Sequence, residues 1–394
     1  MNGSIRMKKD KKKIFIISSS RAEYGLLRNL IKKIYKSKNL KFHLSITGTH
    51  LSSVHGKTIK EVKKDAPIIN SQAKILNFND DSIGISKSFS LGVVKFSKLL
   101  KKYKPNLILV LGDKFEIFSS VVAGTFSRIP IAHIHGGEET VGAIDNFIRH
   151  SITKMSHIHF TSALEHKNRV VQMGENPKNV FNVGALGLED IKNFKFKSKD
   201  YLKEKYNIDF KKKTILVCLH PVSLEPNTEK SNIKQILAAV EPLDNINIIF
   251  TSPNADHGFR IIDKEINTFV KKRQNCFYIR SFGRDDYFSC LKFSSLILGN
   301  SSSGIIEAPS FKTFSINLGS RQKGRIRANS VIDCEIHKDK IRKLLNKYLN
   351  KRVETNGNCF YNPYFKEDSS KKILKILEKI NLNKIIKKIF FNKI

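Results

Sequence analysis

Residues 298–307 combine an apolar run with small hydroxyl side chains, a pattern suited to anion binding. Ser301 and Ser302 can open a helix whose first N–H groups and positive dipole end favour an anion. Glu307 follows one turn later and can accept both hydroxyls of a ribose, while Arg321 is a permanently charged fork for phosphate oxygens. The alternative is that a serine only caps the helix and Arg321 pairs with a surface acid. Together these residues predict a site for a nucleoside diphosphate.

Two polar clusters in the first half of the chain follow apolar runs. Arg21 follows the run at residues 14–17 and is expected to point from its loop into a cleft, at the start of the next helix. Asp113 follows the run at residues 107–111, where a carboxylate can accept a proton from a substrate. Helix capping explains either cluster equally well.

The densest group of titratable residues lies at 131–139 and just beyond it. His133 and His135 are expected to share one side of a strand, because side chains alternate with a period of two. Glu138 and Asp145 follow them, so the segment carries both imidazoles and carboxylates. Proton transfer suits this mixture better than metal binding, since no further spaced histidine completes a metal-ligand pattern.

In the second half, His220 and Asn254 each follow an apolar run. His220 is expected in a cleft, where it can donate a hydrogen bond or a charge to a departing phosphate. Asn254 can orient a ligand or form an Asx turn. Neither a Walker loop nor a G-x-G-x-x-G pattern occurs, which argues against an ATPase or a dinucleotide-dependent oxidoreductase.

Short apolar runs alternate with helix-like segments along most of the chain, which indicates parallel sheets covered on both faces. The expected strands are 14–17, 42–46, 107–111, 129–134, 158–160, 180–183, 214–219, 246–250, 276–279, 296–298 and 313–316. The fold class is therefore α/β, with two doubly wound, Rossmann-like domains facing a cleft. Domains are expected at residues 1–192 and 193–365, followed by a basic helical extension at 366–394. The cleft is the default ligand site.

Length, charge and cysteine content limit the kinds of protein that this chain can be. The 394 residues suit two domains, and the formal net charge is +36. The lysines are spread along the whole chain and no nucleic-acid signature interrupts them, so no nucleic-acid partner is expected. Five scattered cysteines support neither a disulfide framework nor a zinc site. No apolar run is long enough to span a bilayer, so a cytoplasmic protein is expected, with membrane contact conceivable only for the basic C-terminal tail.

The order and content of the clusters resemble the hydrolysing UDP-N-acetylglucosamine 2-epimerases of bacterial sialic- and legionaminic-acid synthesis. The resemblance covers roughly residues 14–335. The segments that carry it are 21–27, 112–113, 133–138, 145–157, 299–304 with Glu307, and 317–322. Such a resemblance implies a glycosyltransferase-B fold, a homo-oligomer, a nucleotide-sugar substrate held by the C-terminal half, and no metal or redox cofactor.

The resemblance also implies a reaction. UDP would leave by anti elimination across C1–C2, and water would then add to the glycal with the opposite configuration at C2. Leaving-group stabilisation would fall to Arg21, His220, Arg321 and the N–H groups at Ser301 and Ser302. The carboxylates expected to move protons are Asp113, Glu138 and Asp145.

The sequence departs from the relatives at two positions. Non-hydrolysing relatives have a glutamate where this chain has His135, which weakens a simple reversible epimerase interpretation; Ser303 stands where some relatives have cysteine. Two alternatives remain open: a glycosyltransferase of the same fold, or a non-catalytic protein that binds a nucleotide sugar or a polyanion. The substrate itself also stays open between UDP-N-acetylglucosamine and a UDP-2,4-diacetamido-2,4,6-trideoxy analogue.

Overall fold

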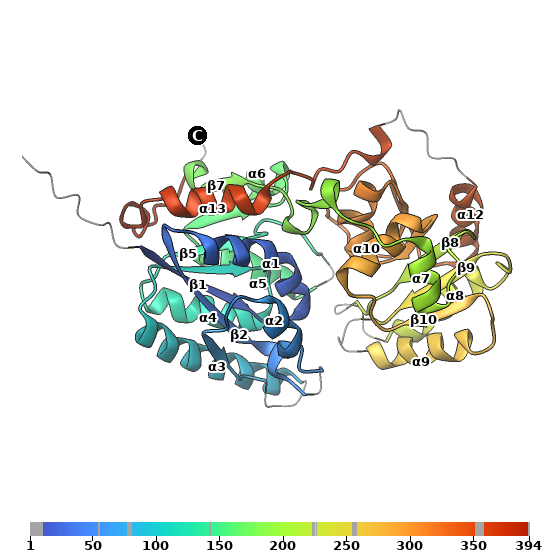
Figure 1. The fold of residues 1–394 in the computed structure, drawn as a ribbon, viewed down its shortest axis with the longest axis horizontal. Helices are drawn as coiled ribbons and strands as arrows, with labels where there is room; N and C mark the ends of the chain where they lie inside the picture. Colours follow the sequence, from blue (N-terminus) through green and yellow to red (C-terminus); the bar gives the residue numbers. More distant parts are fainter. Residues whose placement is uncertain are drawn as a thin grey trace, which may run out of the picture. The chain divides into compact units, whose positions relative to one another are not determined.

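The chain forms two compact units, each built around one parallel sheet (Figure 1). The structure is a computed structural model that describes residues 11–53, 56–76, 81–141, 143–222, 225, 227–253, 258–350 and 358–392. The first unit comprises Met1–Gly137, Phe147–Glu189 and Lys366–Ile394, and the second comprises Glu138–Asn146 and Asp190–Phe365. Contacts therefore group residues 138–146 with the second unit and 366–394 with the first, whereas the sequence alone suggests a single boundary near 192 and a separate extension.

The sheet of the first unit has the strand order β3-β2-β1-β4-β5-β6-β7, and all its neighbouring strands are parallel. Its strands are β1 (Lys12–Ser18), β2 (Leu40–Thr47), β3 (Ser71–Ala73), β4 (Leu107–Leu111), β5 (Ile131–Ile134), β6 (Ile158–Thr161) and β7 (Val180–Asn182). Its helices are α1 (Arg21–Lys36), α2 (Ile59–Asp65), α3 (Ser82–Tyr103), α4 (Phe115–Phe126), α5 (Asp145–Met155), α6 (Leu164–Gln172) and α13 (Ser369–Lys379).

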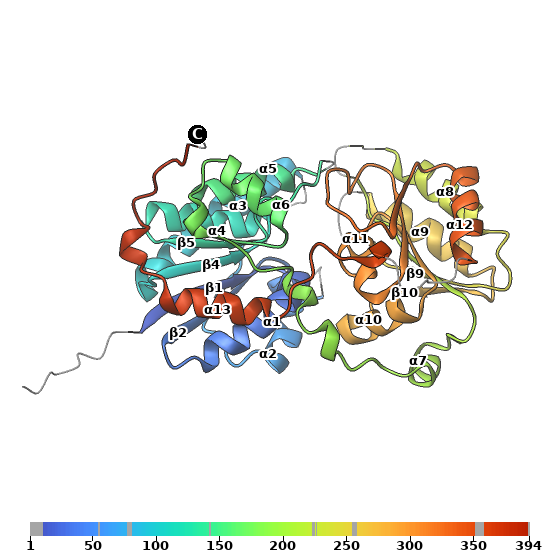
Figure 2. The same cartoon turned by 90° about the horizontal axis from the view of Figure 1, so that it is seen from above.

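Strand β1 shows why this sheet is covered on both faces. Ile14 and Ile16 belong to one buried cluster with α1 and α13, whereas Phe15 and Ile17 belong to a second cluster with α3 and α4. Such continuous apolar strands are expected where helices cover both faces of a parallel sheet. Figure 2 shows α13 lying along α1, where its Ile373 and Leu377 are fully buried. The amphipathic stripe of the C-terminal segment thus packs on the chain's own first unit.

The sheet of the second unit has the order β10-β9-β8-β11-β12-β13 and is also parallel. Its strands are β8 (Thr214–Cys218), β9 (Asn247–Thr251), β10 (Cys276–Ile279), β11 (Leu296–Gly299), β12 (Phe314–Leu318) and β13 (Val331–Cys334). Its helices are α7 (Lys199–Tyr206), α8 (Glu229–Val240), α9 (Phe259–Val270), α10 (Gly283–Phe293), α11 (Ser303–Ile306) and α12 (Lys338–Leu349). One face of the sheet packs on α8, α9 and α12.

Short 3-10 turns join several of these elements. They span Gly48–Leu51, Pro177–Asn179, Leu186–Leu188, Ile191–Asn193, Ala308–Phe311, Asn358–Phe360 and Leu382–Lys384. Within the described ranges, the longest helices are too short or too polar to cross a membrane.

The predicted fold class, two doubly wound α/β domains, is confirmed, and each strand predicted from an apolar run is present. The sequence missed β3 and β13, which lie at sheet edges. The predicted end of β5 is correct, but one expectation about its side chains is not. The strand ends at Ile134, and His135 lies beyond it with φ +66°, so the prediction that His133 and His135 share one side of a strand is wrong.

Candidate functional site

Each sheet has one position where the strand order reverses, and most of the predicted site residues follow the strands on either side of it. The reversal lies between β1 and β4 in the first unit and between β8 and β11 in the second. Connections leave such neighbouring strands in opposite directions, which opens a crevice at their carboxyl ends. Arg21 and Asp113 follow β1 and β4, while His220 and Ser301 follow β8 and β11.

In the second unit, buried Asn300 fixes the loop that carries His220. Its Oδ1 accepts a hydrogen bond from the backbone N of His220 at 2.7 Å, and its Nδ2 donates to the backbone O of His220 at 2.7 Å. The backbone O of Asn300 accepts from Arg321 at 3.0 Å and from Gln322 Nε2 at 2.9 Å. One residue therefore holds the His220 loop and the Arg321 turn together.

Gly299, just before Asn300, is required by a close approach of two strands. Its φ is +140°, and a Cβ placed there would lie 2.0 Å from the backbone O of Cys218 on β8. No other residue fits without moving the backbone. The glycine thus keeps β8 and β11 close enough for Asn300 to reach His220.

His220 is neutral at pH 7 in this structure. Burial, together with the nearby charge of Arg321, lowers its pKa to about 3. Of the two contributions predicted for His220, donation of a hydrogen bond or of a charge, the neutral ring can make only the first.

The serine turn after β11 leads into a very short helix. Helix α11 has one turn, and the 3-10 turn Ala308–Phe311 follows it. Ser301 Oγ accepts from the N of Ser303 at 3.3 Å, and Ser303 Oγ accepts from Tyr287 at 2.7 Å. The turn precedes a helix, but a one-turn helix contributes only a small dipole.

Glu307 directly follows α11 and has a carboxylate oxygen without a hydrogen-bond partner. Its Oε2 is shielded from solvent and has no hydrogen-bond partner within the described structure. Burial raises its pKa to about 7, against the opposing effect of a hydrogen bond with Ser303. A buried acceptor without a partner is costly unless a ligand supplies the donor.

Glu138 is held by an arginine that the sequence did not single out. Its Oε2 lies 3.1 Å from Arg325, with side-chain exposures of 5% for Glu138 and 9% for Arg325. Thr140 Oγ1 accepts from the same arginine at 3.4 Å. The segment that carries Glu138 is thereby tied to the loop after β12 within the second unit.

Asp113 is held by α5 in the first unit. Arg149 of this helix donates to Asp113 Oδ2 and forms a largely buried ion pair with it. His133 Nε2 donates to the backbone O of Gly112 at 2.8 Å, and His133 Nδ1 lies 3.2 Å from Thr153 Oγ1, also on α5. Burial lowers the pKa of His133 to about 3, so this imidazole is neutral. Asp113 is not a helix cap, since Lys114 occupies that position.

The predicted residues that remain have fewer contacts. Arg21 is the first residue of α1 and lies 4.0 Å from Glu61, with both side chains more than half exposed. The cap of α1 is Ser20, whose side chain accepts from Glu23 N. Asp145 begins α5, and Asn254 lies outside the described residues. In the part of the chain that is described, no group of three or more His, Cys, Asp or Glu residues is arranged to hold a metal ion.

Arg149, Asn300 and Arg325 are the residues of this site that sequence reasoning did not propose. Arg149 and Asn300 lie inside the segments that carry the resemblance, but their contacts depend on partners remote in sequence. Asn300 could have been proposed from the sequence, because it is a polar residue that directly follows an apolar strand. Arg325 gave none, because its partner Glu138 lies far away along the chain.

The two parallel sheets have a common strand order, and polar residues follow the strands at which this order reverses. These features define a two-domain Rossmann-type α/β protein. A crystal structure of a Neisseria meningitidis UDP-GlcNAc 2-epimerase bound to UDP-GlcNAc has this fold, with a TM-score of 0.80 at 18% identity over 93% of this chain and 100% of that one.

Residues 32–378 match the family described as UDP-N-acetylglucosamine 2-epimerase, and the chain belongs to this family. It is 39% identical to a Campylobacter jejuni protein named GDP/UDP-N,N'-diacetylbacillosamine 2-epimerase (hydrolyzing), over 97% of this chain and 99% of the relative. It is 37% identical to Escherichia coli polysialic acid biosynthesis protein P7, over 93% of this chain and 94% of the relative. The predicted membership of the hydrolysing 2-epimerases is confirmed.

Proposed function

We propose that this protein is a hydrolysing 2-epimerase that converts a UDP-linked N-acetylated sugar to UDP and the free sugar inverted at C2. The substrate is UDP-N-acetylglucosamine or its 2,4-diacetamido-2,4,6-trideoxy analogue, and the product enters sialic- or legionaminic-type acid synthesis. The observation that carries the proposal is the 39% identity, over nearly the whole chain, to a relative named as a hydrolysing 2-epimerase. The fold alone would suit a glycosyltransferase equally well.

The first chemical step is departure of UDP. A hydrogen on C2 is barely acidic until the C1–O bond stretches and the ring gains oxocarbenium character, so the leaving group must be stabilised first. Arg321, His220 and the N–H groups at Ser301 and Ser302 meet the growing negative charge on the diphosphate. The contacts of Asn300 support this role, because they hold Arg321 and His220 in fixed positions before the substrate arrives. Arg21 is a further candidate for stabilising the leaving group, because its exposed pair with Glu61 is weak.

Proton transfer completes the reaction. A carboxylate removes the C2 proton as the C1–O bond breaks, which gives the glycal and UDP. Water then adds its hydroxyl to C1, and a proton returns to C2 on the opposite face. Asp113, Glu138 and Asp145 are the candidates for these roles; Asp113 and Glu138 are each held by an arginine within their own unit. Elimination followed by hydration is redox-neutral, so the chemistry requires no redox cofactor.

The nucleotide is recognised by the second unit. Glu307 accepts hydrogen bonds from the ribose hydroxyls, which would give its buried Oε2 a partner. Asn254, which follows β9 in the sequence, orients the nucleotide. The active protein is a homo-oligomer, which light scattering on the purified protein tests directly.

Turnover in deuterated water tests the proposed function. Purified protein is incubated with each nucleotide sugar in D2O, and the products are followed by NMR. Release of UDP with a free manno-configured sugar deuterated at C2 is expected. Transfer of the sugar to an acceptor with retention of C2 hydrogen would indicate a glycosyltransferase. Tight binding without any UDP release would indicate a binding protein.

Comparison of the two substrates in the same assay identifies the natural one. The preferred substrate is the one with the higher kcat/KM, since this ratio measures discrimination between competing substrates. A UDP-glucose control, which lacks the N-acetyl group, should give little turnover.

A further inference from the structure

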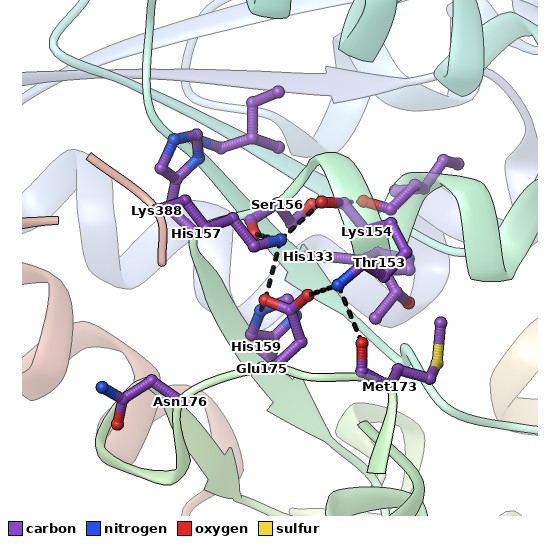
Figure 3. A network of polar contacts seen from close by, with 12 residues as sticks. His133, Thr153, Lys154, Ser156, His157, His159, Met173, Glu175, Asn176 and Lys388 are labelled. Atoms are coloured by element: carbon purple, nitrogen blue, oxygen red, sulfur yellow. Dashed lines mark hydrogen bonds and ion pairs between the residues drawn. The ribbon is translucent and has the colours of Figure 1, made fainter. Parts of the chain in front are cut away.

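The C-terminal tail of the chain returns to the first unit and meets the end of α5. Lys388 Nζ donates to the backbone O of Ser156 at 2.8 Å and to the backbone O of Lys154. The same ammonium lies 2.7 Å from Glu175 Oε2 (Figure 3). A lysine at the end of a helix satisfies carbonyls that lack partners within the helix and complements the negative end of the dipole.

Neighbouring tail residues fix the position of this lysine. Phe391 N donates to the backbone O of Gly174 at 2.8 Å. The ring of Phe390 covers Gly174 so closely that a Cβ on the glycine would lie 2.3 Å from a ring atom. Lys154 Nζ lies 4.9 Å from the centre of the same ring, within the range of a cation–π contact. The tail is therefore docked in a defined register.

Glu175 joins the tail to the core of the sheet. Its side chain is 3% exposed. In addition to Lys388, Lys154 Nζ lies 2.8 Å from its Oε1 and His159 Nε2 lies 3.0 Å from its Oε2. Burial alone would raise the pKa of Glu175, but these donors hold it at about 2. His159 Nδ1 is buried without a partner in the described structure, and burial lowers the pKa of His159. Glu175 is thus ionised and His159 neutral, with its proton on Nε2.

Helix α5 is the element that both the tail and the candidate site contact. Its Arg149 holds Asp113, and its Thr153 lies beside His133, which in turn donates to the backbone O of Gly112. Lys388 and Glu175 hold the other end of the same helix through Lys154. A shift of α5 would therefore move both supports of the turn that carries Asp113.

We propose that Lys388 is a positioning residue for Asp113, acting through α5. The inference rests on the proposed function, in which Asp113 transfers a proton. Small displacements of a reacting group slow chemistry more than they weaken binding, so the effect of losing Lys388 falls on kcat. Lys388 itself does not contact the substrate.

The test compares Lys388→Met, Lys388→Arg and Lys387→Met in the full-length chain. Methionine keeps the aliphatic stem and removes the three donors, arginine keeps the charge and donors, and Lys387 is the exposed neighbour of Lys388. Lys388→Met should lower kcat about tenfold with KM within about twofold of wild type. Lys388→Arg should restore most of the loss, and Lys387→Met should behave as wild type.

Hydrogen exchange gives a readout that does not depend on activity. In Lys388→Met, amides of the last turn of α5 and of residues 112–118 should exchange faster than in wild type and in Lys387→Met. Unchanged kcat together with unchanged exchange would overturn the proposal, as would a loss that Lys388→Arg fails to restore. If wild-type protein released no UDP, the proposed function would fail, and unchanged exchange at residues 112–118 would overturn the positioning role separately.

Discussion

The ion pair of Glu138 and Arg325 brings together two buried side chains that are far apart in sequence. Arg325 places a permanent cation beside this carboxylate, and removing one partner of such a buried pair is costly. The cation that pairs with this candidate acid is thus supplied by a different loop. Asp113 likewise pairs with a largely buried arginine, Arg149.

Replacing Arg325 by methionine should change how activity depends on pH. The change leaves Glu138 buried beside an apolar side chain, which favours its protonated form. We expect kcat at pH 7 to fall about a hundredfold, with partial recovery as the pH rises and the carboxylate ionises again. The pH profile of kcat measures this effect.

Arg327→Met is the matched control for that prediction. Arg327 lies two residues further along and pairs with Asp333, whose side chain is 61% exposed. Its loss should change kcat only slightly, because exposed pairs contribute little. If both variants gave the wild-type pH profile, Arg325 would have no part in controlling Glu138.

Glu307 should make nucleotide binding depend on pH near neutrality. Its pKa of about 7 means that the carboxylate, which accepts from two ribose hydroxyls, becomes the dominant form as the pH rises from 6 to 8. UDP-glucose should therefore bind about tenfold more tightly at pH 8 than at pH 6, since its diphosphate does not titrate in this range. Calorimetric titration measures the two affinities. Glu307→Gln should abolish the difference; an equal difference in the variant would assign the pH effect to another group.

Single residues also show where sequence reasoning stops. The types of Asp113, Glu138, His220 and Arg321 identified them as candidates, because few other residues can move protons or bind phosphate. Their partners could not be predicted in the same way. The contact of Arg325 with Glu138 exists only once the chain has folded, so neither residue's neighbours along the sequence reveal it.

Helix α5 is the element on which the candidate site of the first unit depends most. It supports Asp113 through Arg149, and Glu175 in turn holds the end of the helix through Lys154. Apolar runs predicted the central strands well, because both of their faces are buried and the pattern is continuous. The runs failed for β3 and β13, which have three and four residues at sheet edges and expose part of their surface.

Glu175→Gln should remove a component of acid stability from the first unit. The folded-state pKa of Glu175, about 2, lies below the unfolded value of 4.5, so its stabilisation is present above pH 4.5 and lost as the pH falls toward 2. At pH 7 we expect the free energy of unfolding of the variant to be lower by about 2 kcal/mol, because two ammonium groups lose their carboxylate. The variant should therefore unfold at a lower urea concentration. Urea titrations followed by circular dichroism at pH 7 and pH 3 measure the change.

The difference between wild type and Glu175→Gln should shrink at pH 3, since wild-type Glu175 has then begun to lose its charge advantage. Glu165→Gln is the control, because Glu165 is an exposed acid in the first turn of α6. A difference that stayed constant from pH 7 to pH 3 would show that packing, and not charge, accounts for the effect.

Over the whole molecule, the dominant property is a formal net charge of +36. The charge is spread over the sequence and does not form one basic helix or stripe, which distinguishes this chain from typical nucleic-acid-binding proteins. A field of this sign raises the local concentration of an anionic substrate and speeds its encounter with the protein. The net charge therefore affects the rate of substrate binding, which the hydrogen bonds and ion pairs of the site do not reveal.

Salt should therefore lower kcat/KM for the UDP-linked substrate and leave kcat nearly unchanged. Screening shortens the reach of the field from about 10 Å at 0.1 M to about 3 Å at 1 M, so kcat/KM should fall several-fold over roughly this range. Initial rates in sodium chloride, with sucrose at matched viscosity as the control, measure the effect. A fall in kcat of the same size would instead indicate that salt disturbs the charge pairs that hold Asp113 and Glu138. Equal rates at all salt concentrations would mean that the lysines have no part in substrate capture.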